Sequence, residues 1–298
     1  MNKTTKKMNI LITGCNGQLG NEIQLLEKQH PQHTYFNTDV AELDITNPKA
    51  IGQFVEENQI DGIVNCAAYT AVDKAESDAD FCRKLNADAP GYLAEAIEQR
   101  GGWMIQISTD YVFDGTQHTP YREDDETCPN SVYGRTKLEG EENVTNRCHR
   151  SMVIRTAWLY STFGNNFVKT MLRLGREKDE LGVIFDQIGT PTYARDLAVA
   201  IFAAIEKGIS SGIYHFSNEG VASWYDFTLA IHRLAGIACR VRPIHTTDYP
   251  TPATRPHYSV LDKSKIKSVY GIEIPHWETS LADCIALLKN NLPKKWKK

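Results

Sequence analysis

The sequence lacks the features that mark a membrane protein or a nucleic-acid-binding protein. Its longest apolar run, residues 197–205, is far shorter than a bilayer span. The 33 basic and 37 acidic residues leave a formal net charge of −4, which gives no electrostatic signal for DNA, RNA or an anionic lipid surface. We therefore expect no nucleic acid and no membrane among its partners.

Cysteine is present, but its pattern excludes two kinds of site. The seven cysteines are widely spread, with no Cys-x-x-Cys pair and no cysteine–histidine cluster of zinc spacing. We expect reduced thiols and no metal. The basic residues 1–7 are followed at once by an expected strand and a glycine turn, whereas a signal peptide needs a longer apolar stretch. These observations predict a cytoplasmic protein.

The pattern that is present is an alternation of short apolar runs with longer amphipathic stretches, which is typical of βαβ units around a parallel sheet. It predicts an α/β fold of the Rossmann type, a doubly wound parallel sheet with a smaller α/β lobe. We expect buried strands at 9–12, 34–36, 62–65, 103–107 and 152–154. We expect helices at 19–28, from Asn47-Pro48 onward, at 78–99, at 133–147 and at 280–290.

The composition changes after Arg155, where aromatic residues and Asn/Gly cluster and proline-rich loops follow. We interpret this change as a domain boundary. Residues 1–157 are expected to form a nucleotide-binding core to which 191–219 return, and 158–190 with 220–298 are expected to form the substrate-binding lobe.

A glycine-rich turn, Gly14-Cys15-Asn16-Gly17-Gln18-Leu19-Gly20, directly follows the first expected strand. Glycine lets the chain turn sharply and lets backbone N–H groups approach a pyrophosphate, while the N-terminus of the next helix favours an anion. In this strand–turn–helix context the motif predicts a dinucleotide site.

Two acidic residues follow this turn in the expected nucleotide site. Asp39 ends the second expected strand, where an acid hydrogen-bonds the adenosine ribose hydroxyls and repels a 2′-phosphate, so it favours NADH. Asp44-Ile45 could flank the adenine, or Asp44 could instead cap the helix that starts at Asn47.

The second motif pairs Ser108-Thr109-Asp110-Tyr111, at the end of a central strand, with Tyr133 and Lys137 on a later helix. Residues at positions i and i+4 project from one helix face, and an ammonium group lowers the pKa of a neighbouring phenol. We therefore expect Tyr133 to be a general acid or base and Lys137 to tune it. Thr109 is expected to polarise a carbonyl oxygen at the ligand-binding edge of the sheet.

With these motifs the chain resembles the extended short-chain dehydrogenases/reductases, and among them the dTDP-4-dehydrorhamnose reductase family. The resemblance covers nearly the whole chain. Its motifs occur in family order in residues 14–20, 65–76, 108–115, 133–141, 155–160, 164–171, 186–192 and 251–256.

The resemblance implies reduction of the 4-keto group of dTDP-4-dehydro-6-deoxy-L-mannose to dTDP-L-rhamnose, with NADPH or NADH as cofactor. Tyr133 would donate the proton, Lys137 would hold the nicotinamide ribose and Thr109 would polarise the ketone. The cofactor-binding residues would be Gly14, Asn16, Gly17, Gln18, Leu19, Asp39, Asp44, Ile45, Ala67, Ala68, Tyr69, Tyr133 and Lys137.

The same resemblance implies a nucleotide-sugar site. Val72, Thr109, Asp110, Tyr111 and Trp158 would lie near the sugar, and Asn165, Asn166, Gln187 and Arg255 would bind the diphosphate. Plainer interpretations stay open: Trp158 as a core aromatic residue, Arg255 as a surface ion pair, and Asn165-Asn166 as a helix start.

Some members of the family dimerise through a magnesium ion held by glutamates. Glu22 matches one of these ligands, but residues 187–197 offer no matching acid around Arg195, so we expect no metal and leave open a monomer or a homodimer.

Three other functions share parts of this pattern. A nucleotide-sugar dehydratase would carry an acid in place of Tyr111, and an epimerase would keep its NAD bound without net consumption. A regulatory subunit like that of methionine adenosyltransferase would bind a partner chain without catalysis.

Overall fold

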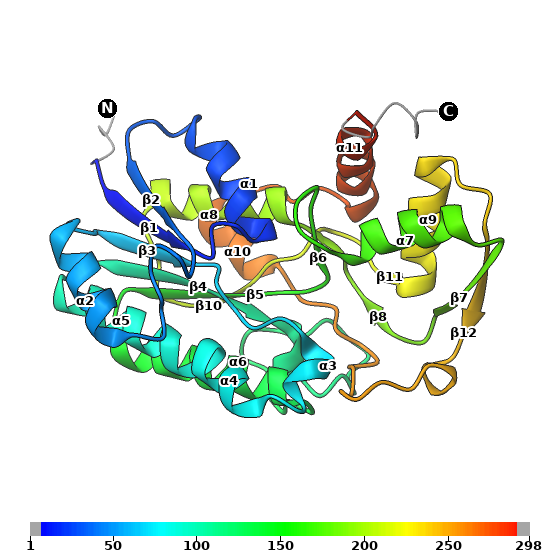
Figure 1. Ribbon diagram of the computed structural model, residues 1–298, viewed down its shortest axis with the longest axis horizontal. Helices are drawn as coiled ribbons and strands as arrows, with labels where there is room; N and C mark the ends of the chain where they lie inside the picture. The colour runs from blue at the N-terminus through cyan, green and yellow to red at the C-terminus, as the bar shows by residue number, and fades with distance from the viewer. Residues whose placement is uncertain (1–6, 291–298) are drawn as a thin grey trace.

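Short aliphatic runs form the central sheet of the computed structural model, which describes residues 7–290 (Figure 1). Residues 1–6 of the basic N-terminal segment lie outside the described part. Six parallel strands lie side by side in the order β10-β5-β4-β3-β1-β2. All five strands expected from the sequence are confirmed. The bounds are β1 Asn9–Thr13, β2 Thr34–Thr38, β3 Gly62–Asn65, β4 Trp103–Thr109, β5 Ser151–Thr156 and β10 Gly212–His215.

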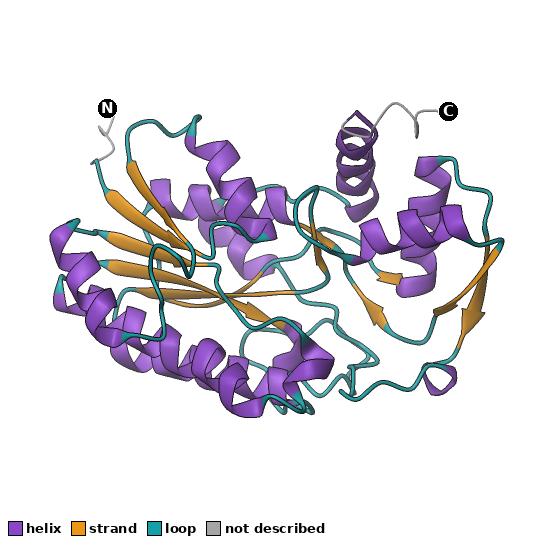
Figure 2. Ribbon diagram, in the orientation of Figure 1, coloured by secondary structure: helices purple, strands orange, loops and turns teal. Residues whose placement is uncertain are grey.

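Helices cover both faces of this sheet (Figure 2), which confirms the doubly wound α/β class. One face is covered by α1 Gln18–Glu27, α8 Ala194–Lys207 and α10 Ser264–Tyr270, and the other by α2 Pro48–Glu57, α5 Ala89–Gln99 and α6 Val132–Arg147. The α2 helix starts as expected, because the Asn47 side chain accepts hydrogen bonds from the N–H groups of Lys49 and Ala50 while Pro48 takes the first helical position. Within residues 7–290, no helix is both long and apolar enough to cross a membrane.

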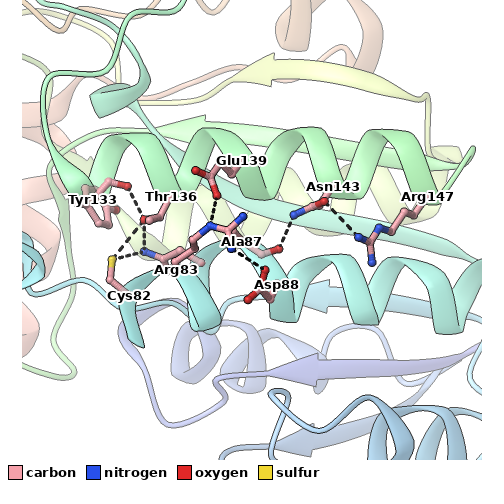
Figure 3. Close-up of polar contacts among 10 residues, drawn as sticks. Cys82, Arg83, Ala87, Asp88, Tyr133, Thr136, Glu139, Asn143 and Arg147 are labelled. Carbon is pink, nitrogen blue, oxygen red and sulfur yellow. Dashed lines mark hydrogen bonds and ion pairs between the residues drawn. The ribbon is translucent and has the colours of Figure 1, made fainter. Parts of the chain in front are cut away.

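The helical stretch expected at 78–99 contains a wider turn that the sequence did not predict. After α4 (Ala79–Arg83), residues Lys84–Asp88 form a π-helical segment that leads into α5. Helix α6 lies against this segment, and the Asn143 side chain donates a 3.0 Å hydrogen bond to the Ala87 carbonyl (Figure 3). The approach is so close that a Cβ atom on Gly140 would overlap the carbonyl oxygen of Asn86.

A hydrophobic cluster separate from the two on the sheet forms the lobe beyond the carboxyl ends of the strands (Figure 1). Its helices are α7 Phe167–Glu177, α9 Trp224–Ala235 and α11 Trp277–Asn290. Short strand pairs accompany them: β7 Glu180–Ile184 with β12 Arg240–Ile244, β8 Ile188–Gly189 with β11 Ala222–Ser223, and β6 Leu159–Tyr160 with β9 Thr192–Tyr193. The short helix α3, Val72–Ala75, follows β3.

The chain crosses between core and lobe more than once. Strand β10 pairs with β5, and α8 packs on α1, so residues from the range 191–219 lie in the core. Helix α10 also belongs to the core, because Ile266 and Tyr270 are buried in the same cluster as the sheet. The predicted lobe range 220–298 therefore contains one core helix, and the division into core and lobe stays our proposal.

The close approach of α6 generates a paired stability prediction. We expect Gly140→Ala to lower the free energy of unfolding by about 2 kcal/mol, because the Asn86 backbone must move. Gly52→Ala in α2 should instead raise it by about 0.5–1 kcal/mol, because a Cβ there meets no atom within 4 Å and alanine favours a helix. Urea unfolding of the two variants measures both effects, and equal stability of the two would contradict the assigned packing.

Candidate active site

The turn after β1 can be built only with glycine at two positions. Gly14 has a φ of +65°, and a Cβ atom there would come within 2.7 Å of the Ala67 backbone. A Cβ on Gly20 would lie 2.5 Å from the carbonyl oxygen of Gly14. The N–H group of Gly17 donates a 3.0 Å hydrogen bond to the same oxygen, and α1 begins at the next residue. The turn thus brings bare backbone and a helix N-terminus to one place, as a pyrophosphate requires.

A cavity of about 550 Å³ lies beside this turn. Its walls include seven of the residues that the sequence predicted for the cofactor: Gly14, Gly17, Asp39, Asp44, Ile45, Ala67 and Ala68. They also include residues that the sequence did not indicate: Thr13, Val40, Leu43, Thr46, Cys66, Phe81, Lys84 and Leu85. Apolar side chains alternate there with carboxylates and one ammonium group, which suits a nucleoside. The residues present therefore fit the adenosine half of a dinucleotide.

The two predicted acids of this cavity are held by the backbone. Asp39 accepts hydrogen bonds from the N–H groups of Asn16 (3.2 Å) and Val40 (2.8 Å). Asp44 accepts bonds from the hydroxyl and N–H groups of Thr46, which hold its pKa below the usual range. Because Asn47 caps α2, the capping alternative for Asp44 is wrong. Its place beside the adenine stays a proposal.

Three residues predicted to bind the cofactor make contacts with other parts of the protein. The Leu19 side chain is buried in the core cluster of the sheet, so it presents only its backbone to the turn. The Gln18 side chain accepts a hydrogen bond from Asn166 and donates one to the carbonyl of Leu159, both in the range assigned to the lobe. The backbone of Tyr69 is bonded at both its N–H and its carbonyl by the buried Asn86 side chain.

The three predicted catalytic residues come from β4 and α6. Thr109 is the last residue of β4, and Tyr133 and Lys137 lie in the first two turns of α6. The Thr109 hydroxyl donates a 2.9 Å hydrogen bond to Asp110. The ring of Tyr111 meets that of Tyr133 edge to face, with centroids 5.4 Å apart. The carboxyl end of β4 thus carries a hydroxyl, two phenols and a carboxylate.

Burial dominates the electrostatics of Tyr133 and Lys137. Desolvation raises the pKa of Tyr133, and a hydrogen bond with Thr109 offsets only part of this rise. Desolvation also lowers the pKa of Lys137 to about 8. The Lys137 ammonium donates a 2.6 Å hydrogen bond to the Ile107 carbonyl. The lowered pKa expected for Tyr133 is therefore not seen in this structure, because burial raises it instead; the effect of Lys137 on the phenol stays a prediction.

A buried ion pair holds α6 against the sheet. The Arg155 guanidinium of β5 contacts the Glu141 carboxylate through Nε at 3.0 Å and Nη2 at 2.7 Å. The hydroxyl of Ser108, the residue before Thr109, donates a 2.5 Å hydrogen bond to the same carboxylate. Glu141 follows Lys137 by one helical turn, so the pair positions the face that carries Tyr133 and Lys137.

Two residues predicted for the substrate are engaged with protein partners. Arg255 forms a bidentate ion pair with Asp73 of α3, at 2.7 and 3.0 Å, and its binding of the diphosphate stays a prediction. Val72 begins the same short helix. Trp158 stacks on Trp224 with ring centroids 3.5 Å apart and adopts a φ of +48°, so one face of its indole is covered.

The other residues expected to bind the diphosphate divide into buried and exposed positions. Asn166 caps α7 by accepting a hydrogen bond from the Lys169 N–H, which confirms the helix-start interpretation for it. Gln187 is buried and donates to the Thr246 hydroxyl. Asn165 is exposed.

Glu22, the one residue that matched a metal ligand, is fully buried. It accepts hydrogen bonds from Ser161 (2.6 Å) and Arg195 (3.1 Å). Among residues 7–290, no three His, Cys, Asp or Glu side chains gather as metal ligands would. Arg195 thus takes the place beside Glu22 that a cation would need.

Asp110 is a buried carboxyl group whose importance the sequence only partly indicated. Burial raises its pKa to about 6, although hydrogen bonds with Ser259 and Thr109 oppose this rise. Ser259 comes from the loop before α10 and is also buried. No spacing in the sequence connects it with Asp110.

A glycine turn, a cavity that fits the adenosine half of a dinucleotide and a Tyr/Lys pair at the carboxyl edge of a doubly wound sheet define a short-chain dehydrogenase/reductase. Comparison with known proteins narrows this class. A model of the family described as RmlD substrate binding domain matches residues 8–290. A dTDP-4-dehydrorhamnose reductase of Escherichia coli (strain K12) is 40% identical over 286 residues, which cover 92% of this chain and 96% of that protein. The chain belongs to the dTDP-4-dehydrorhamnose reductase family, which confirms the resemblance seen in its motifs.

Solved structures agree with this assignment. A dTDP-4-dehydrorhamnose reductase from Clostridium acetobutylicum has a TM-score of 0.91 at 46% identity. One from Bacillus anthracis, solved in complex with NADP, has a TM-score of 0.91 at 38% identity. Each alignment covers 94% of this chain and 99% of the other.

The raised pKa of Asp110 predicts that the charged form of this carboxyl lowers the free energy of unfolding. The Asp110 carboxyl has a pKa of about 6 in the folded protein and an ordinary, lower pKa in the unfolded chain, so the folded state binds more protons. The free energy of unfolding therefore falls as the pH rises from the unfolded pKa through 6. We expect Asp110→Asn to raise the free energy of unfolding by about 2 kcal/mol at pH 8, with the gain shrinking towards pH 4. Urea unfolding across this pH range measures the effect, and a gain independent of pH would contradict it.

Proposed function

We propose that the chain catalyses the NADPH- or NADH-dependent reduction of the 4-keto group of dTDP-4-dehydro-6-deoxy-L-mannose, which yields dTDP-L-rhamnose. One observation carries this proposal: Thr109, Tyr133 and Lys137 lie on neighbouring elements at the carboxyl edge of the sheet, on the edge that also carries the glycine turn and its cavity. Membership of the reductase family supplies the substrate class.

The residues of the site have complementary roles in this reduction. The bound nicotinamide would supply the hydride for the ketone carbon. Tyr133 donates a proton to the forming alkoxide, because a phenol is protonated at neutral pH, as a proton donor requires. Lys137 is mostly protonated below its pKa of about 8, and its charge stabilises the phenolate left behind. The Thr109 hydroxyl turns from Asp110 to the ketone oxygen and polarises it.

The same edge of the sheet would receive the nucleotide sugar. Val72, Asp110, Tyr111 and Trp158 are proposed to contact the sugar, and Asn165 and Arg255 the diphosphate. The Arg255 guanidinium binds the Asp73 carboxylate through two nitrogen atoms, and the same bidentate geometry binds phosphate. Asn166 and Gln187 make hydrogen bonds within the protein, so we propose that they support the site without contacting the diphosphate.

We also propose a cytoplasmic location for this reaction. All seven cysteines are free thiols and six of them are buried or half-buried, which suits a reducing compartment. The proposed partner is the nucleotide-sugar substrate.

Turnover of the proposed substrate tests this function. The loss of reduced-nicotinamide absorbance is followed with dTDP-4-dehydro-6-deoxy-L-mannose, and the product is identified by mass. We expect Tyr133→Phe to lower kcat by about 100- to 10,000-fold, because the phenol supplies the proton in the transition state. The cofactor affinity of this variant should change by less than about threefold, since the hydroxyl contributes at most one hydrogen bond to binding.

Tyr225→Phe, in helix α9 of the lobe, is the matched control and should keep its turnover. If folded wild-type protein oxidises no reduced cofactor with this substrate, the proposed function is wrong. If Tyr133→Phe keeps its turnover, only the role of Tyr133 as proton donor is wrong.

A further inference from the structure

One lysine, Lys84, lines the cavity beside the glycine turn. Among the described residues that line the cavity, Lys84 is the one cation, and it shares the wall with Asp39 and Asp44. It acts on that wall electrostatically, because its charge contributes to the lowered pKa of Asp44. A ligand in the cavity thus meets carboxylates and an ammonium group together.

The Lys84 ammonium is free to bind a ligand. Within residues 7–290 it forms no ion pair with a carboxylate, and its side chain is exposed. The preceding residue, Arg83, has the same charge but points elsewhere: it contacts Glu139 of α6 at 2.7 Å and Asp88 at 3.8 Å (Figure 3). Successive residues of a helix project in directions about 100° apart, so the adjacent side chains of Arg83 and Lys84 point toward different parts of the protein.

The carboxylate of Asp39 opposes the binding of a 2′-phosphate in this cavity. It suits the two hydroxyls of an NADH ribose and repels a 2′-phosphate. The Asn16 and Val40 N–H groups hold this carboxylate in place, so it cannot turn away from an added phosphate without losing both bonds. A phosphate at this position therefore needs a positive charge from another element of the wall.

We propose that Lys84 binds the 2′-phosphate of NADPH and so sets how well the chain accepts NADPH relative to NADH. This assignment rests on the proposed function, because it places the adenosine half of the cofactor in the cavity. Lysine suits the task, since its ammonium is a compact charge on a flexible stem that can reach a phosphate from the rim. Asp39 favours the unphosphorylated ribose and Lys84 the phosphorylated one, so the two side chains set the preference between them.

Adenosine fragments test the assignment without any need for turnover. Isothermal titration of the full-length protein with 2′,5′-ADP and with 5′-AMP measures the preference for the 2′-phosphate directly. We expect Lys84→Met to lower the affinity ratio of 2′,5′-ADP to 5′-AMP about five- to tenfold, the range of a charge-assisted contact near the surface. Lys84→Arg should keep most of the wild-type ratio. Arg83→Met, the matched loss of a neighbouring cation, should leave it within about twofold.

The same variants are then assayed for the ratio of kcat/KM with NADPH to that with NADH, which should fall in parallel. An unchanged ratio in Lys84→Met, or an equal fall in Arg83→Met, would overturn the assignment while leaving the reductase activity in place. Wild-type protein that reduces the sugar with neither NADPH nor NADH would instead overturn the proposed function, and with it this assignment.

Discussion

The buried ion pair between Arg155 and Glu141 is the contact on which the site depends. Both side chains are at most 3% exposed, so neither charge could remain without the other, and loss of one partner of such a pair typically costs about 3–5 kcal/mol. The pair joins β5 to α6, and Ser108 connects the same carboxylate to β4. Thr109 follows Ser108, and Lys137 precedes Glu141 by one turn. The distance between hydroxyl, phenol and ammonium groups is therefore set by a contact outside the site.

The features that could be predicted from the sequence are those that local chemistry determines. The apolar run in the strand from Asn9 to Thr13 predicts a buried strand, and the turn after it needs glycine because Gly14 has a positive φ. The i, i+4 spacing of Tyr133 and Lys137 places them on one face of any helix. The fold class and the catalytic pair follow from these rules, and so does most of the glycine-turn side of the cavity.

The features that could not be predicted depend on contacts between distant segments or on the loss of water. The ion pair of Arg255 with Asp73 joins residues 182 positions apart, and no spacing announces it. Lys84 reaches the cavity from a π-helical segment, whose extra residue per turn leaves no periodic signal. The pKa of Tyr133 is raised because the phenol loses water when it is buried, and burial is a property of the folded site.

Helix α10 has a consequence for how this architecture can change. Its Ile266 and Tyr270 complete the core after the chain has already built α7, α9 and their strands in the lobe. In the proposed division, core and lobe segments alternate along the chain, since α8, β10 and α10 of the core lie between α7, α9 and α11 of the lobe. A continuous segment from α7 to α11 therefore cannot be exchanged as one block, because α8, β10 and α10 would leave with it and the core would be incomplete.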